Sequence, residues 1–298
     1  MRISVVVCTY NRDLYLSHCL RNLKNQDFNK DDFEIIIVDN NSTDNTSSIC
    51  LNFIEQNPEL KILYFLEEKV GLSHARNTGI AISSGEIISF IDDDGFAKPN
   101  YLKSIDAIAS HVKFKEYLAF GGKVIPVYNE DKEPKWLSKY IEGVVSKVDL
   151  GDCIIPFNKK YPAGCNMVFR KEVFDVYGGF NSDLHTRGDD KYVFDKLKKN
   201  NVKILYSPKI EVEHFIDDYR LEKKFIIRLS KIIGQSEAIR LKDSYFKLVI
   251  KFLEYILKLN LAFVLALVFL LDNHLPKAKY ILVVRYYVLL GFFIRKKF

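Results

Sequence analysis

The sequence has few of the features that mark secreted, zinc-binding or clearly membrane-spanning proteins. Its five cysteines are odd in number and form no CxxC pair, which argues against a disulfide framework and against a zinc site of paired cysteines. The apolar stretch 3–8 is too short for the core of a signal peptide, and no small-residue cleavage site follows it. We therefore expect the globular part of the chain to fold in a reducing, cytosolic compartment.

Long uncharged apolar runs are also lacking. Residues 259–271 contain one polar side chain, Asn260, and residues 280–294 are apolar except for Arg285. Neither run reaches the roughly 18 to 20 uncharged residues of a clear membrane span. The 298 residues are 48% hydrophobic and 28% charged, which excludes a disordered chain and allows two domains, or one large domain with an appendage.

Charge is divided unevenly along the chain, whose net charge is +6. Residues 1–218 hold 28 basic and 33 acidic side chains, a net −5, whereas residues 219–298 hold 16 basic and 5 acidic ones, a net +11. In this tail a basic amphipathic helix is predicted over 221–241, and cations flank long apolar runs, a pattern that suits anionic lipid better than nucleic acid. We predict a functional domain over 1–218 and a membrane-associated helical tail over 219–298; helices packed on the domain are the alternative.

Strand and helix patterns alternate over the first part of the chain. Apolar runs typical of buried parallel strands occur at 3–8, 34–38, 62–66 and 87–91, with helical spacing at 14–24, 43–56 and 73–83. A strand at 167–170, helices at 171–177 and 191–198, and a strand at 202–206 follow a proline-containing loop region at 121–164. This order predicts an α/β fold with a mostly parallel sheet, whose ligands bind at the carboxyl ends of the strands.

Three consecutive carboxylates, Asp92, Asp93 and Asp94, follow the fourth predicted strand. Adjacent carboxylates raise one another's pKa values unless a cation neutralises them. Mg²⁺ and Mn²⁺ prefer oxygen ligands, and they share their coordination between protein, phosphate and water. The segment therefore predicts a divalent-cation site, and a solvated acidic turn is the alternative.

Asp39 and Arg76 are two further candidates. Asp39 ends the second strand, where it can accept hydrogen bonds from a nucleobase or ribose or serve only in the turn, while Asp44 is better explained as a helix cap. Arg76, near the start of the helix at 73–83, can meet phosphate, the strand-end carboxylates or a surface acid.

Two later segments contain further candidates. Asp189 and Asp190 open the helix predicted near Lys191, where one carboxylate can cap the helix and one can act as a general base. His214 follows the strand predicted at 202–206 and can serve either as a metal ligand or in the structure.

Between residues 3 and 214 the sequence resembles the family 2 glycosyltransferases. Any one of the shared motifs is weak by itself, but seven occur in the order of the family. They are residues 5–12 (VVVCTYNR), 37–44 (IVDNNSTD), Gly71 with 75–79 (ARNTG), the DxD-like 92–94 (DDD), 164–167 (GCNM), 178–180 (GGF) and 188–190 (GDD).

The resemblance implies an A-type glycosyltransferase fold, which is a Rossmann-like, mostly parallel sheet with flanking helices. It also implies transfer of a sugar, with inversion, from a nucleotide-diphosphate sugar to a carbohydrate or lipid-linked acceptor. Thr9, Tyr10 and Arg12 would line the nucleotide pocket, Asp39 would read the base and Asp92 would lie near the ribose and diphosphate. The residues that we expect at the donor are Thr9, Tyr10, Arg12, Asp39, Arg76, Asp92 and Asp93.

The resemblance further implies that Asp94 binds the divalent cation, Mn²⁺ or Mg²⁺, and that His214 is a further ligand. Asp190 matches the inverting base, although the family commonly has Glu-Asp where this chain has Asp189-Asp190. The loop at 128–161 would cover the site, with Trp136 stacking on a sugar or serving in packing. With the tail on lipid, we expect the enzyme at the cytoplasmic face of the membrane, in cell-surface polysaccharide or glycolipid synthesis.

Other functions compete with this interpretation. A haloacid-dehalogenase-type phosphatase also uses DxDG after an apolar strand and a later GDD, and a catalytically inactive membrane-bound scaffold would need only to bind the nucleotide sugar. A sugar-nucleotide pyrophosphorylase is disfavoured because residues 9–13 contain no glycine for its phosphate loop.

Overall fold

The structure, a computed structural model, describes residues 1–158, 160–183, 188–242 and 244–294. They form two compact units, which are described separately. The first contains residues 1–126, 148–183 and 189–215, and the second contains 127–147, 188 and 216–294 apart from residue 243.

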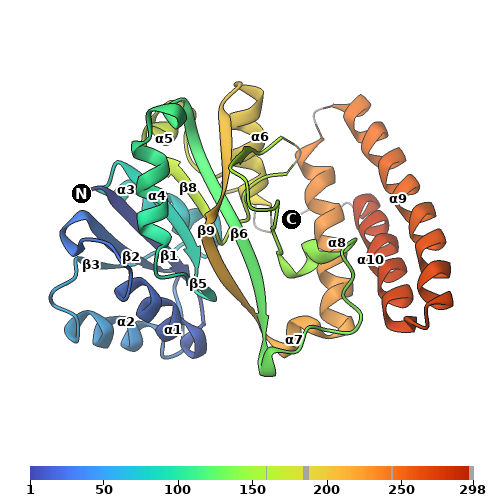
Figure 1. Ribbon diagram of the computed structural model, residues 1–298, viewed down its shortest axis with the longest axis horizontal. Coiled ribbons are helices and arrows are strands. Elements are labelled where there is room, and N and C mark those ends of the chain that lie inside the picture. Colours follow the sequence, from blue (N-terminus) through green and yellow to red (C-terminus); the bar gives the residue numbers. More distant parts are fainter. Residues whose placement is uncertain (159, 184–187, 243, 295–298) are drawn as a thin grey trace. The chain divides into compact units, whose positions relative to one another are not determined.

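The first unit is built on a mixed sheet (Figure 1). Four strands are parallel in the order β3-β2-β1-β4, and the sheet continues through β8, β6, β9 and β5, with β7 paired to β9. Strand β8 is antiparallel to β4 and to β6. The mostly parallel α/β sheet predicted from the sequence is confirmed. The bounds of the strands are Ile3–Thr9 (β1), Phe33–Asp39 (β2), Ile62–Leu66 (β3), Ile87–Asp92 (β4), Gly95–Ala97 (β5), Tyr117–Tyr128 (β6), Ile155–Pro156 (β7), Met167–Arg170 (β8) and Lys203–Ile216 (β9).

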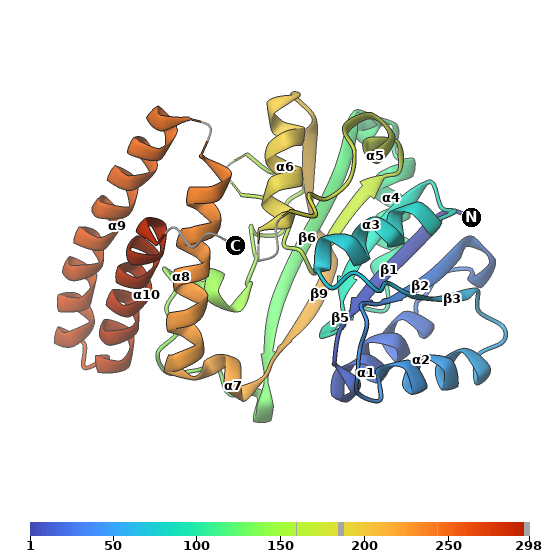
Figure 2. The ribbon, with the colours of Figure 1, turned by 180° about the vertical axis from the view of Figure 1, so that it is seen from behind.

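Helices cover both faces of this sheet (Figures 1 and 2). Val5 and Val7 of β1 point into a core with α1, α2 and α4, whereas Val6 points into the opposite core with α3, α5 and α6. The central strands are therefore buried on both sides, as their uninterrupted apolar runs predict. The helices are Asp13–Lys24 (α1), Thr46–Glu55 (α2), Leu72–Ile82 (α3), Tyr101–Ser110 (α4), Glu172–Tyr177 (α5) and Asp189–Lys199 (α6), with short 3₁₀ turns at Lys30–Asp32 and Val112–Phe114.

The second unit is helical and includes a segment far away in the sequence. Residues 127–147, with 3₁₀ turns at Asn129–Asp131 and Glu142–Val145, share its core, where the Trp136 ring stacks on Tyr280 at 4.7 Å between centroids. Of the two roles expected for Trp136, this contact fits packing, because the buried ring stacks on another side chain of the protein. Residues 127–147 thus cluster with the chain from residue 216 onward. Its helices are Asp218–Leu221 (α7), Lys223–Arg240 (α8), Tyr245–Leu271 (α9) and Leu275–Phe293 (α10).

Glycines allow α8 and α10 to approach closely. A Cβ atom at Gly234 would lie 2.1 Å from the Val288 carbonyl oxygen, and one at Gly291 would lie 2.1 Å from the Lys231 carbonyl oxygen. Both distances are far below van der Waals contact, so any side chain at either position would force the helices apart.

Helix α9 is longer than the uncharged run at 259–271 suggested. It has 27 residues and is the one helix of the described chain that is long and apolar enough to cross a membrane, by length and composition. The prediction counted only uncharged residues, whereas α9 also contains charged side chains such as Lys251 and Lys258. Only 17% of its most apolar window is buried. Its exposed apolar side chains include Leu253, Leu257, Leu261, Val264, Leu267 and Leu271.

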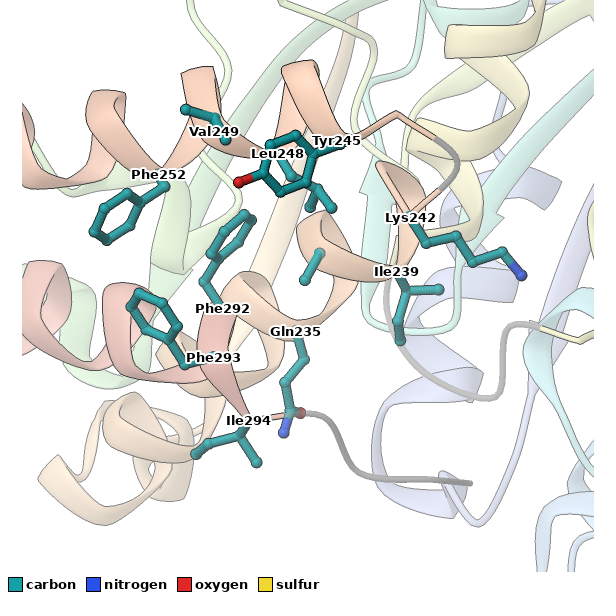
Figure 3. Close-up of a pocket in the computed structure, with 11 residues that line it drawn as sticks. Gln235, Ile239, Lys242, Tyr245, Leu248, Val249, Phe252, Phe292, Phe293 and Ile294 are labelled. Atoms are coloured by element: carbon teal, nitrogen blue, oxygen red, sulfur yellow. The ribbon is translucent and has the colours of Figure 1, made fainter.

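A cavity of about 520 Å³ lies between the ends of α8, α9 and α10 (Figure 3). Its lining is mainly apolar and aromatic, with Phe252 from α9 and Phe292 from α10, and Gln235 and Lys242 add polar groups. Helix α9 therefore leaves a cavity against α8 and α10 at this end.

Candidate active site

The site begins where the parallel strands end. In the sheet register Thr9 is opposite Asp39, and Cys8 is opposite Asp92, so the last residues of β1, β2 and β4 lie side by side. This is the edge at which parallel α/β sheets bind ligands. The structure thus places Thr9, Asp39 and Asp92 at one edge of the sheet.

The loops after β1 and β2 hold each other in place. The Asn11 amide donates to Ser42 Oγ at 2.9 Å, and the Thr43 amide donates to Asn11 Oδ1 at 2.8 Å. Asp44 accepts hydrogen bonds from the Asp13 and Thr46 amides, close to the first turns of α1 and α2. The bonds to Asp44 agree with the capping role expected for it. The hydrogen bonds between the two loops also fix the backbone next to Tyr10. The Tyr10 side chain is 48% exposed.

Asp39 is buried and uses both carboxylate oxygens. Oδ1 accepts from the Ser42 amide at 2.9 Å, and Oδ2 accepts from the Tyr64 hydroxyl at 2.8 Å. Burial and the hydrogen bond to Asp39 raise the pKa of the Tyr64 hydroxyl, which therefore stays a donor. These contacts hold the Asp39 carboxylate in one orientation at the end of β2.

The acidic triplet after β4 faces a cation from the β1–α1 loop. Arg12 Nη2 lies 3.1 Å from Asp94 Oδ2, and Arg12 Nε lies 3.7 Å from Asp93 Oδ1. Burial, with the charge of Asp94 added, raises the pKa of Asp93 to about 8, while Arg12 acts in the opposite direction. Because Asp93 and Asp94 are buried, the alternative of a solvated acidic turn does not apply.

Arg76 lies at the centre of the site and is only 2% exposed. Its Nη1 atom lies 2.6 Å from Asp189 Oδ2, and its Nη2 atom lies 3.2 Å from both Asp92 Oδ1 and the Gly164 carbonyl oxygen. Burial opposes the positive charge, but Asp189 and Asp92 outweigh it and raise the pKa of Arg76. Of the partners that the sequence suggested for Arg76, the structure shows one strand-end carboxylate, Asp92, and it adds Asp189 at the start of α6.

The Gly178-Gly179-Phe180 motif supports this arginine. The Asn77 side chain donates to the Phe180 carbonyl and accepts from the Phe180 amide, both at 2.8 Å. A Cβ atom at Gly179 would lie 2.3 Å from Asn77 Oδ1, so a side chain there would displace the Asn77 amide from these two hydrogen bonds. The clamp holds the Phe180 ring 5.3 Å from the Arg76 guanidinium, within the range of a cation–π contact.

Asp189 and Asp190 begin α6 but have different surroundings. Asp189 is buried against Arg76, whereas Asp190 is partly exposed and accepts from the Lys191 amide at 2.7 Å. Burial of its carboxyl group and the charge of Asp189 raise the pKa of Asp190, and Arg76 and Lys191 oppose this. A carboxylate with a raised pKa suits proton transfer.

His214 was predicted to follow a strand, but it lies inside β9, opposite Gly95 of β5. The strand continues past residue 206 because it pairs with β5 over residues 212–214. The ring is 2% exposed, and its Nε2 atom lies 3.1 Å from Asp94 Oδ1. The two residues predicted to bind a metal are therefore neighbours.

The structure adds a third type of donor, which the sequence reasoning missed. Asp92, Cys165 and His214 each place one potential ligand atom so that all three lie within 4.8 Å of one another. Within the described residues, Nδ1 of the buried His214 has no hydrogen-bond partner. Oxygen, sulfur and nitrogen donors together fit a divalent cation. The one feature of the sequence that could have pointed to Cys165 is its place in the 164–167 motif.

Comparisons with known proteins agree with this geometry. A family model described as Glycosyl transferase family 2 matches residues 4–178. The chain is 38% identical over 103 residues to glycosyltransferase GlyG of Streptococcus pneumoniae, covering 35% of the chain and 33% of GlyG. It is 22% identical over 250 residues to a glucosyl-dolichyl phosphate glucuronosyltransferase of Haloferax volcanii, covering 80% of the chain and 77% of that protein. The chain thus spans only about a third of the length of GlyG.

Among solved structures, a mannosyltransferase of Pyrobaculum calidifontis in complex with GDP-Man and Mn²⁺ has a TM-score of 0.61 at 22% identity. The match covers 82% of this chain and 65% of that one. At this identity the likeness establishes the fold, and the predicted A-type architecture is confirmed.

Proposed function

The chain belongs to glycosyl transferase family 2, and from this premise we propose that it moves a sugar, with inversion, from a nucleotide-diphosphate sugar to an acceptor hydroxyl. The observation that carries the proposal is the placement of Asp39 and Asp92 at one sheet edge, where buried Arg76 contacts Asp92 and also holds Asp189, the neighbour of Asp190. Asp94, two residues beyond Asp92, lies 3.1 Å from Arg12. The GDP-Man complex of the Pyrobaculum mannosyltransferase supports the class of donor.

Donor binding is assigned to the strand-end loops. Thr9, Tyr10 and Arg12 line the nucleotide side, and Asp39 accepts hydrogen bonds from the base or ribose. Asp92, whose side chain is 35% exposed, is open to the ribose and diphosphate. Asp93 lies within ion-pair distance of Arg12, and Arg76 positions Asp92 through its 3.2 Å contact.

A divalent cation, Mn²⁺ or Mg²⁺, is assigned to Asp94 and His214. The 3.1 Å separation between His214 Nε2 and Asp94 Oδ1 supports this assignment. Such a cation supplies Lewis-acid neutralisation of the charge that grows on the departing diphosphate. The protein holds the ligands in place by burying both side chains.

Proton transfer is assigned to Asp190. Asp189 is engaged by Arg76 at 2.6 Å, which leaves Asp190 as the carboxylate available to a substrate. The acceptor oxygen attacks the anomeric carbon as its proton passes to Asp190, and the bond to the diphosphate oxygen breaks on the opposite side. The product is inverted, and no covalent sugar–enzyme intermediate forms.

The test is a donor screen that measures nucleoside diphosphate released from UDP-, GDP- and TDP-sugars by the purified chain with acceptor and Mn²⁺. With the productive donor, Asp190→Asn should lower the rate about 10²- to 10⁴-fold, the usual contribution of a general base. Asp175→Asn, which changes an exposed carboxylate on α5, is the matched control and should leave the rate unchanged. A normal rate in Asp190→Asn would remove the base assignment, and binding of nucleotide sugar without turnover would favour the inactive scaffold.

The phosphatase alternative has no support from the comparisons, since the family match and the structural neighbour are glycosyltransferases. Its decisive assay remains hydrolysis of a generic phosphate ester, which we expect to be absent.

We assign the tail to the cytoplasmic surface of a membrane and the acceptor to lipid-linked or polysaccharide chemistry. The exposed apolar side chains of α9 and the net charge of +11 over residues 219–298 support a contact with anionic lipid. The name of the Haloferax relative, which includes dolichyl phosphate, supports a lipid-linked substrate class.

A further inference from the structure

Three segments that are distant in sequence place metal-binding atoms together. Asp92 ends β4, Cys165 lies in the turn that leads into β8, and His214 lies in β9. One donor atom from each lies within 4.8 Å of the other two. This juxtaposition depends on the order of strands in the sheet, in which β8 lies next to β4.

Packing alone does not account for these side chains. Cys165 and His214 are each only 2% exposed, and Nδ1 of His214 has no hydrogen-bond partner within the described parts of the chain. Buried polar atoms in folded proteins are nearly always paired, so a buried imidazole with one unpartnered nitrogen needs an explanation, and a bound ligand is one. Its other nitrogen, Nε2, lies 3.1 Å from Asp94 Oδ1. Arg76 lies 3.2 Å from Asp92 Oδ1 but supplies no partner to the imidazole.

The donor set decides which ions fit. Mg²⁺ prefers six oxygens, whereas Zn²⁺ and Co²⁺ bind thiolate and imidazole well. A site of carboxylate oxygen, imidazole nitrogen and thiolate sulfur is therefore poorly matched to Mg²⁺.

We propose that Cys165 Sγ joins Asp92 and His214, beside Asp94, as a ligand of the divalent-cation site, and that the site prefers thiophilic ions such as Zn²⁺ and Co²⁺ to Mg²⁺. The role of this ion in sugar transfer rests on the proposed function, but its binding does not. On binding, the S–H bond of Cys165 breaks, a sulfur–metal bond forms, and the proton passes to solvent.

Cobalt binding to the full chain without nucleotide tests the proposal directly. Thiolate coordination should produce a sulfur-to-cobalt charge-transfer band in the near ultraviolet, beside the weaker d–d bands. Cys165→Ser and Cys165→Ala should both lose the charge-transfer band. Two different substitutions are used so that a folding defect in one of them does not decide the result. Cys153→Ser removes the exposed cysteine and should keep the band.

Calorimetric titration supplies the second measurement. Cys165→Ser should weaken Zn²⁺ binding by about tenfold or more and change Mg²⁺ binding by less than about twofold. Four results would each overturn the proposal. Cobalt could fail to bind, or bind without the charge-transfer band. The band could also survive Cys165→Ser, or be lost in Cys153→Ser. Sugar transfer without the band refutes only this inference, and a band without sugar transfer refutes only the proposed function.

Discussion

The ion pair between Arg76 and Asp189 offers the most direct test of how the site is held together. Arg76→Met removes the guanidinium but retains an apolar side chain, so it leaves Asp189 buried without its partner at 2.6 Å. Removing one member of a buried pair costs about 3–5 kcal/mol, mainly because the remaining charge is uncompensated. The contact with Asp92 adds little, since that carboxylate is 35% exposed and solvent screens it.

A double-mutant cycle separates the pair from its surroundings. Urea unfolding of Arg76→Met, Asp189→Asn and the double variant should show non-additivity of about 1–3 kcal/mol, because the second substitution removes the charge that the first has stranded. Arg2→Met is the matched control: Arg2 also lies 2.7 Å from a carboxylate, on Asp106, but both side chains are partly exposed. It should cost about 1 kcal/mol or less.

Two results would refute the reasoning. One is a loss of stability for Arg76→Met no larger than that for Arg2→Met, which would mean that the buried charge of Asp189 is relieved in another way. The other is simple additivity in the cycle, which would show that the two side chains do not interact.

Three further expectations concern pH, donor binding and the membrane. Burial raises the pKa of Asp190, and only the ionised carboxylate can accept a proton. The value of kcat should therefore fall as the pH decreases through a pKa above 3.8, the ordinary value for aspartate. The same fall of kcat at low pH in Asp190→Asn would contradict this. Asp39→Asn should raise the donor KM about tenfold with a smaller change in kcat, and Tyr64→Phe should do less because it keeps the carboxylate; an effect on kcat alone would count against donor binding. Leu257→Glu should lower flotation of the full chain with anionic vesicles about tenfold, whereas Val112→Glu, at an exposed site outside the tail, should not; equal flotation of both variants would argue against membrane contact through α9.

Local pattern accounts for much of what was predicted correctly. The uninterrupted apolar runs of β1, β2 and β4 require burial on both faces, and such runs place the residues that follow them at the carboxyl edge of a parallel sheet. Asp39, Asp92 and Arg12 could therefore be assigned to one site from their positions after strands. The same reasoning stopped β9 at residue 206, because its second half is stabilised by pairing with β5, a contact that no local pattern shows.

The sequence by itself determined the α/β class, the seven ordered motifs and the separation of an acidic domain from a basic tail, because these depend on residue type and short-range periodicity. Tertiary structure alone decided that Arg76 engages Asp189 rather than Asp190, and that Trp136 packs on Tyr280. It also decided that Cys165 lies beside Asp92 and His214. The physical reason is that each of these contacts joins residues far apart in the chain, and only the order and register of the strands and helices bring them within reach.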